Sequence, residues 1–144
     1  MHGLAAIWPS VSERRKLDGF HNRCLRGIWG IKVAYVSRVS NVQVLQRTGQ
    51  QRLSTELVRQ QLLLYGKVAR LRGDDLMREV ALCPGSLRPA TDRYVRKVGR
   101  PRLDWTTEVG KLALEAAGNM ASLEASIAVE SSWKNLVGTF IDSR

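Results

Sequence analysis

The sequence predicts an all-α fold, in which a small helical bundle is followed by a basic linker containing Pro and Gly and by a C-terminal helical hairpin. Two capping-box motifs, SVSE at 10–13 and SNVQ at 40–43, mark the starts of helices. Apolar residues then recur at the three- and four-residue intervals of one helix face. Only residues 32–39 resemble a strand, and no second segment is available to pair with them. We therefore interpret that stretch as an extended loop.

The first predicted helix runs from the capping box at Ser10 and Glu13 to about Trp29, where Gly30 can end it. Its apolar residues fall on one face, which we expect to be buried: Leu17, Phe20, Cys24, Leu25 and Ile28. The opposite face is basic and polar, and it carries Arg15, Lys16, Asn22, Arg23 and Arg26. The helix is thus predicted to have one buried apolar face and an opposite face that is basic.

Two further helices follow in the basic half of the chain. The first of them, at 41–48, is short and must pack on its neighbours to be stable. We expect Ser54 to cap the next helix, which continues to Arg72. Gly66 lies in its middle and costs roughly 1 kcal/mol relative to Ala. A close helix crossing at that residue would explain the glycine.

The segment GDDL at 73–76 looks like the paired aspartates of a polymerase. Two-metal phosphoryl transfer requires carboxylates around two metal ions that lie about 4 Å apart. Here the pair follows a helix, and no third acid lies close in sequence. We interpret Asp74 or Asp75 as the N-cap of a short helix that ends before Pro84.

The remaining chain is divided by composition into a linker and a last helical part. The three predicted segments are a basic helical region at 1–83, a basic linker with GRPR at 84–103, and a C-terminal helical pair at 104–144. Asp104 caps a helix that Gly118 ends, and two further helical stretches follow it. We assign Trp105 and Trp133 to packing, because each begins an apolar stripe.

The charge of the chain points to a polyanionic partner. The formal net charge is +10, and thirteen basic but only three acidic residues precede residue 73. The part from residue 103 onward has three basic and six acidic residues. A balance of this kind favours nucleic acid first and an anionic membrane surface second. Arginine outnumbers lysine, 17 to 6, which suits forked binding of phosphate, although codon usage is an alternative cause.

Two groups of cations are the candidate nucleic-acid contacts. The helical group, predicted to contact phosphates, consists of Arg15, Lys16, Arg23, Arg26, Arg59 and Arg70. The linker group, predicted to form a flexible second contact, consists of Arg96, Lys97, Arg100 and Arg102. The Gly-Arg-Pro core of the linker could enter a narrow minor groove, contact phosphates generally, or serve only as a basic tether. Val98 interrupts the basic residues that a groove-binding hook would need.

No catalytic, metal or cofactor site is expected. His21 and Cys24 lie one turn apart, but structural zinc needs four ligands and only His2 and Cys83 remain. A packed helix face is the preferred interpretation. Neither histidine belongs to a recognisable nucleophile triad, and no phosphate-binding glycine loop is present.

The two cysteines give no disulfide framework, which favours an intracellular protein, and we expect it in the nucleus. The opening MHGLAAIW lacks the features of a signal peptide. No apolar stretch approaches the roughly 20 residues of a membrane helix, so no membrane association is expected. The pattern gives no oligomeric state.

Several segments together resemble the region that follows the polymerase domain in reverse transcriptases of non-LTR (LINE-type) retrotransposons. In the order typical of that family, they are LDGFHNRCLRGIWGI at 17–31, SNVQVLQRTG at 40–49, LVRQQLLLYGKVARL at 57–71, GRPRLDW at 99–105 and SSWKNLV at 131–137. The resemblance implies the C-terminal part of a polyprotein that copies element RNA into DNA. In that family the polymerase aspartates and the endonuclease lie upstream, so this chain would be non-catalytic and would work beside the parent's polymerase domain.

The chain departs from the family pattern at several places. Relatives often have Trp-Gly-His where this sequence has Tyr65, Gly66 and Lys67, so no role of that histidine is carried over. Some relatives also contain a Cys-Cys-His-Cys knuckle that is missing here. A decayed, non-functional relic of the element is therefore one alternative.

The sequence thus predicts a non-catalytic module that holds template RNA or target DNA through Arg and Lys. A helical protein-interaction segment, folded against its parent's thumb, is the competing hypothesis. A free-standing enzyme is the least favoured one.

Overall fold

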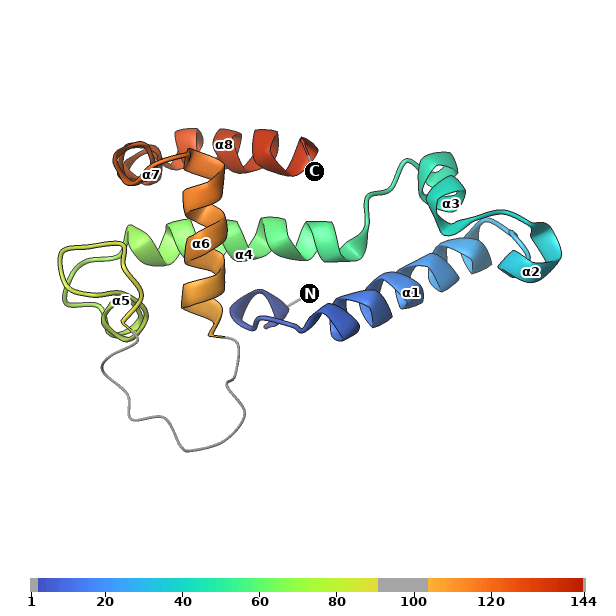
Figure 1. Ribbon diagram of the computed structural model, residues 1–144, viewed down its shortest axis with the longest axis horizontal. Helices are drawn as coiled ribbons and strands as arrows, with labels where there is room; N and C mark the ends of the chain where they lie inside the picture. Colours follow the sequence, from blue (N-terminus) through green and yellow to red (C-terminus); the bar gives the residue numbers. More distant parts are fainter. Residues whose placement is uncertain (1–2, 91–103, 144) are drawn as a thin grey trace, which may run out of the picture. The chain divides into compact units, whose positions relative to one another are not determined.

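The computed structural model describes residues 3–90 and 104–143, and in these ranges the chain is helical (Figure 1). Its elements are the 3-10 helix η1 (Leu4–Ala6) and the α-helices α1 (Val11–Ile28), α2 (Ala34–Ser37), α3 (Asn41–Thr48), α4 (Leu53–Ala69), α5 (Leu76–Ala81), α6 (Trp105–Ala117), α7 (Met120–Ala128) and α8 (Glu130–Asp142). Within the same ranges no strand forms, and the only β-type pairing is an isolated bridge between Leu82 and Pro89. The predicted all-α class is confirmed.

The chain packs as two compact units. The small unit comprises residues 9–58, and the large unit comprises the described part of residues 1–8 and 59–144. Helix α4 contributes its first turns to the small unit and the rest to the large one. This division cuts across the segments predicted from composition, because the apolar residues of α4 pack with helices that follow the linker.

In the small unit, α1 packs on α3, and Leu25 and Val44 are buried. Both predicted capping boxes form. The Ser10 amide donates to Glu13 Oε2 at 2.7 Å, and the Ser40 amide donates to Gln43 Oε1 at 2.8 Å. The side chains of both serines accept the reciprocal bonds. These local motifs fix where the two helices begin, as the sequence predicted.

Two predictions for the small unit are wrong. Phe20, Cys24 and Ile28, which were expected to be buried, are exposed, whereas Asn22 and Arg26 are buried beside Leu25. Helical spacing defines the faces of α1, but only the position of α3 and of the chain leading to it decides which face is covered. The segment expected to be an extended loop also contains the helical turn α2, which Arg38 ends in the left-handed region with φ of 56°.

The predicted cap of α4 is also corrected. Ser54 lies inside the helix, which begins at Leu53, and its amide donates to Asp18 Oδ1 at 2.8 Å. The Ser54 hydroxyl donates to the other carboxylate oxygen of Asp18 at 2.7 Å. A carboxylate from α1 therefore caps α4 and brings negative charge to the positive end of its dipole.

The large unit is built around Trp133 of α8, which is fully buried. Its indole Nε1 donates to the carbonyl of Leu62 in α4 at 3.0 Å. A Cβ added to Gly66 would collide with the same indole ring. The close helix crossing expected at Gly66 is thus confirmed, as is the packing role assigned to Trp133.

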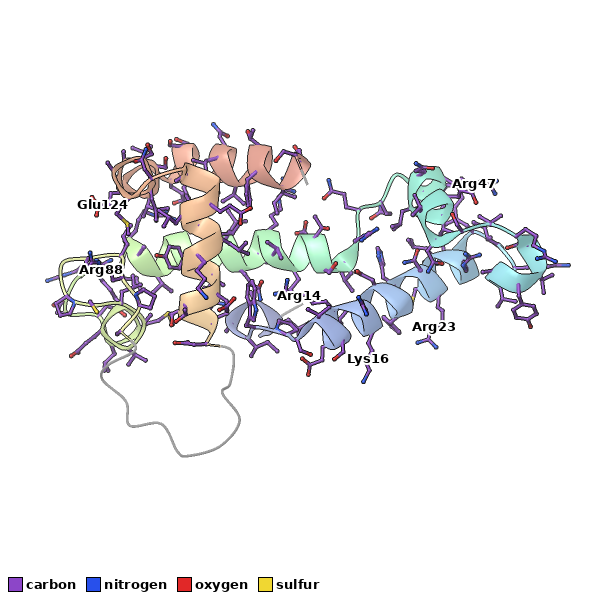
Figure 2. The ribbon with its side chains drawn as sticks, in the orientation of Figure 1. Arg14, Lys16, Arg23, Arg47, Arg88 and Glu124 are labelled. Atoms are coloured by element: carbon purple, nitrogen blue, oxygen red, sulfur yellow. The ribbon has the colours of Figure 1, made fainter. Side chains whose placement is uncertain are left out.

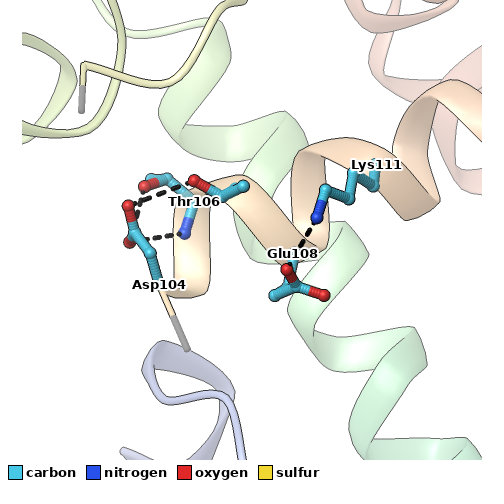
Figure 3. Close-up of polar contacts among 5 residues, drawn as sticks. Asp104, Thr106, Glu108 and Lys111 are labelled. Atoms are coloured by element: carbon cyan, nitrogen blue, oxygen red, sulfur yellow. Dashed lines mark hydrogen bonds and ion pairs between the residues drawn. The ribbon is translucent and has the colours of Figure 1, made fainter. Parts of the chain in front are cut away.

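Helices α6, α7 and α8 pack on one another in this unit, with α7 and α8 in the place of the expected C-terminal pair. Asp104 caps α6 as predicted, because its Oδ1 accepts from both the amide and the hydroxyl of Thr106 (Figure 3). One turn later, Lys111 pairs with Glu108 at 2.9 Å. Asp75 likewise accepts from the Met77 amide and caps α5, which confirms the interpretation of the paired aspartates.

Two aromatic side chains of the large unit, buried Tyr65 and half-buried Trp105, bond to other segments of that unit. The Tyr65 hydroxyl donates to the Leu87 carbonyl at 3.0 Å, and burial raises the pKa of Tyr65 to about 12. The Trp105 indole donates to the Ala5 carbonyl at 2.6 Å. Tyr65 thus holds the chain at Leu87, and Trp105 holds the N-terminal segment at Ala5.

Candidate nucleic-acid interface

Three of the predicted phosphate contacts lie exposed on α1. They are Arg15, Lys16 and Arg23. Lys16 and Arg23 are seven residues apart, which is close to two helical turns, and they therefore share a side of the helix. Figure 2 shows both side chains extending from the lower edge of α1, while α3 lies on the other side of that helix.

The small unit has four further exposed cations that the sequence did not single out. They are Lys32, Arg38, Arg47 and Arg52. Arg47 lies on α3 (Figure 2), and the others lie in or beside the connections between helices. Periodicity could not find them, because it identifies faces of long helices and is silent about short turns. Seven exposed cations thus belong to this one unit.

The carboxylates of the small unit are engaged within the fold. The unit contains nine basic and three acidic residues. The Glu13 carboxylate accepts hydrogen bonds from the hydroxyl and the backbone amide of Ser10. Both bonds lower the pKa of Glu13, and the bond from the hydroxyl has the larger effect. Asp18 caps α4, and Glu56 is half-buried and also has a partner. The exposed cations therefore far outnumber the acids that could offset them, and the unit carries a positive field.

Arg26 does not belong to this exposed set, although it was predicted to contact phosphate. Its side chain is only 6% exposed. The guanidinium donates to the carbonyls of Lys32 and Val39 at 3.0 and 2.6 Å, and also to Ser37 Oγ and Asn41 Oδ1. The chain between α1 and α3 has carbonyls without helical partners, and a five-donor guanidinium satisfies them. Arg26 is a structural residue of the small unit.

Arg59 and Arg70 belong to the large unit and are half-buried. The guanidinium of Arg70 donates to the Ile127 carbonyl at 3.3 Å, at the end of α7. That of Arg59 lies beside Gly138 of α8, and the residue has an interaction partner within the fold. Both side chains therefore contribute to packing between helices, and only part of each is accessible to a ligand.

The second predicted contact lies outside the described residues. This applies to Arg96, Lys97, Arg100 and Arg102, and with them to the GRPR segment. The part of the linker that is described is tied back to α5. The Cys83 amide donates to the Arg88 carbonyl at 2.8 Å, and the Ala90 amide donates to the Ala81 carbonyl at 3.1 Å.

A pocket of about 380 Å³ opens at the end of α4 in the large unit, and its polar lining includes Arg70, Arg78 and Glu124. Both arginines donate to backbone carbonyls, Arg70 to Ile127 and Arg78 to Ala69. An acid also lines the pocket, so it is poorly suited to an anion. It does not add to the basic surface of the small unit.

Among the described residues, no three His, Cys, Asp or Glu side chains are grouped so that they could hold a metal ion. In the same residues, no helix combines the length and apolar composition needed to cross a membrane. Comparison with known proteins finds no matching family model, no similar curated protein and no similar solved structure.

Proposed function

We propose that this chain is a non-catalytic nucleic-acid-binding module, derived from the C-terminal region of a retrotransposon RNA-directed DNA polymerase. It would contact template RNA or target DNA through Arg and Lys. One observation carries the proposal: the small unit exposes seven cations, while its carboxylates are used in helix caps and other internal contacts.

This arrangement suits a phosphate backbone for a physical reason. The long side chains of Arg15, Lys16 and Arg23 reach into solvent from a rigid helix, so they can follow a backbone without a change of fold. Each phosphate that they neutralise releases condensed counterions, which supplies a favourable and salt-dependent free energy. Guanidinium groups add forked hydrogen bonds to phosphate oxygens.

The sequence resemblance supports the setting of the module. It suggests a position after the polymerase domain of the same polyprotein, with the template or target held close to that domain. If the module binds target DNA in the nucleus, the protein must be located there. The polymerase and endonuclease residues of the parent would lie in other parts of the polyprotein, which is why we assign no catalysis to this chain.

A second candidate function is docking to another protein domain. Helix α5 favours it, because Leu76, Met77 and Val80 are all exposed on this short helix. Exposed apolar patches often mark interaction surfaces. A polymerase domain of the parent could cover this helix while the small unit binds nucleic acid, so the two functions are compatible. A decayed relic would show neither activity.

Salt-dependent titration tests the proposed function. Fluorescein-labelled RNA and duplex DNA are titrated with the full chain between 50 and 200 mM salt, and the slope of log K against log salt concentration is measured. We expect tight binding at low salt. In R15A/K16A/R23A, three lost phosphate contacts should reduce the slope on duplex DNA by up to about 2.7.

The matched control removes three exposed cations from the large unit. R72A/K111A/K134A lowers the net charge by the same amount, and in the folded chain these residues pair with Asp74, Glu108 and Glu130. We expect this variant to keep most of the slope. Equal losses in the two triple variants would show that net charge alone acts, and absence of binding at low salt would reject the function.

A further inference from the structure

The connection between α1 and α3 carries several large apolar side chains that are exposed and lie close together in sequence. The most exposed rings are Trp29 and Tyr35, at 57% and 80%. Ile28, Val33 and Val36 are exposed beside them in sequence. Water contact with so much apolar surface is unfavourable, so a patch of this kind usually has an occupant.

The backbone beneath these side chains is firmly held. Arg26 donates from inside the unit to the carbonyls of Lys32 and Val39. The Ile31 amide donates to the Arg26 carbonyl at 2.9 Å, and the Arg38 amide donates to the Ala34 carbonyl at 2.9 Å. Because buried Arg26 and local bonds fix the segment, its aromatic rings are presented to solvent by an ordered scaffold. Binding to such a surface needs little further ordering of the chain.

The charges in and around this segment indicate which kind of ligand would cover its apolar side chains. Lys32 and Arg38 are exposed within the same segment, and no acid lies between residues 19 and 55. The exposed apolar residues of α5 differ, because Asp74, Asp75 and Glu79 accompany them. Aromatic rings together with cations suit a polyanion that also has planar rings accessible for stacking. Single-stranded nucleic acid offers such rings, whereas the bases of a duplex are stacked on one another.

We propose that residues 28–38 form a stacking platform for single-stranded nucleic acid, RNA or DNA. Trp29 and Tyr35 stack on bases, and Lys32 and Arg38 bind the neighbouring phosphates. This inference rests on the proposed function and makes it more specific, because it names unpaired strands as the ligand. The cations on α1 then bind the backbone without regard to base.

The test compares two probes on the full chain. One is a fluorescein-labelled oligothymidylate, and the other is an abasic strand with the same number of phosphates. W29L/Y35L keeps apolar side chains but removes the aromatic faces, while W29F/Y35F keeps the faces. F20L is the matched control, because Phe20 on α1 lies outside the platform and is as exposed as Trp29.

Stacking predicts a specific pattern of affinities. W29L/Y35L should bind oligothymidylate at least about tenfold more weakly, while its affinity for the abasic strand is unchanged. W29F/Y35F should stay within about threefold of the parent chain. F20L should bind both probes as the parent does. Far-UV circular dichroism of each variant checks that its helices are intact.

Several outcomes would overturn the platform. If W29L/Y35L retains its affinity for oligothymidylate, or loses affinity equally for the abasic strand, the rings do not stack on bases. Tighter binding to vesicles of phosphatidylserine and phosphatidylcholine than to oligothymidylate, lost in W29L/Y35L, would assign the patch to a membrane surface. If the parent chain binds duplex DNA but not oligothymidylate at low salt, the platform fails and the proposed function stands. The proposed function fails separately, if the parent chain binds neither RNA nor duplex DNA at low salt.

Discussion

At the scale of single residues, Gly66 shows how one missing side chain lets two helices meet. The indole of Trp133 lies where a Cβ on Gly66 would be, and its Nε1 donates to the Leu62 carbonyl one turn earlier. A glycine inside a helix is unfavourable on its own, but here it permits a large ring to be fully buried. The gain from burying Trp133 outweighs the cost of the glycine.

Substitution of Gly66 by Ala should therefore destabilise the large unit. We expect the free energy of unfolding to fall by about 1–3 kcal/mol, since the indole or α8 must move. The measurement is urea denaturation of the full chain. G110A is the matched control, because a Cβ at Gly110 in α6 meets its nearest neighbour at 3.8 Å. It should be neutral or stabilising, and a similar loss in both variants would contradict the explanation.

At the scale of elements, the two capping boxes were reliable signals in the sequence, whereas partners distant in sequence could not be predicted. The capping boxes at Ser10 and Ser40 involve residues three apart, so the sequence alone locates both helix starts. The cap of α4 comes instead from Asp18, which is 36 residues away, and no local pattern indicates it. Arg26 was likewise misassigned, because its hydrogen-bond partners lie on chain that folds back over α1.

The Asp18 cap gives a prediction at the same scale. D18A should lower the stability of the small unit by about 1–2 kcal/mol, because the Ser54 amide loses a charged acceptor at the positive end of α4. Hydrogen exchange at the amides of the first turn of α4 measures the effect directly. S54A keeps the amide bond and loses only the hydroxyl bond, so it should cost less. Greater loss in S54A would reject Asp18 as the cap.

At the scale of the whole molecule, charge and packing are distributed differently. The sequence predicted a basic first half, and most of that charge lies exposed on the small unit. It did not predict that α4 belongs to two units, because composition carries no information about which apolar stripes meet. Such a unit, with nine basic and three acidic residues, repels itself, and this repulsion weakens its folded state.

Added salt should accordingly stabilise the small unit. Between 10 and 150 mM salt, we expect a gain on the order of 1 kcal/mol in the free energy of unfolding, because the Debye length falls from about 30 to 8 Å. Urea is the suitable denaturant, since it is uncharged. R15A/K16A/R23A should show a smaller gain. An equal gain in this variant would mean that exposed charge on α1 does not limit stability.

The contrast between Trp29 and Trp133 provides two optical reporters in one chain. Trp133 has no solvent contact, so its emission should lie at short wavelength and resist quenching by acrylamide. Trp29 is more than half exposed, so its emission should lie at longer wavelength and be quenched readily. Trp29 is the only Trp of the small unit, whereas Trp8 and Trp105 belong with Trp133 to the large unit. The difference between the spectra of the parent chain and W29F would therefore follow the melting of the small unit without any added dye.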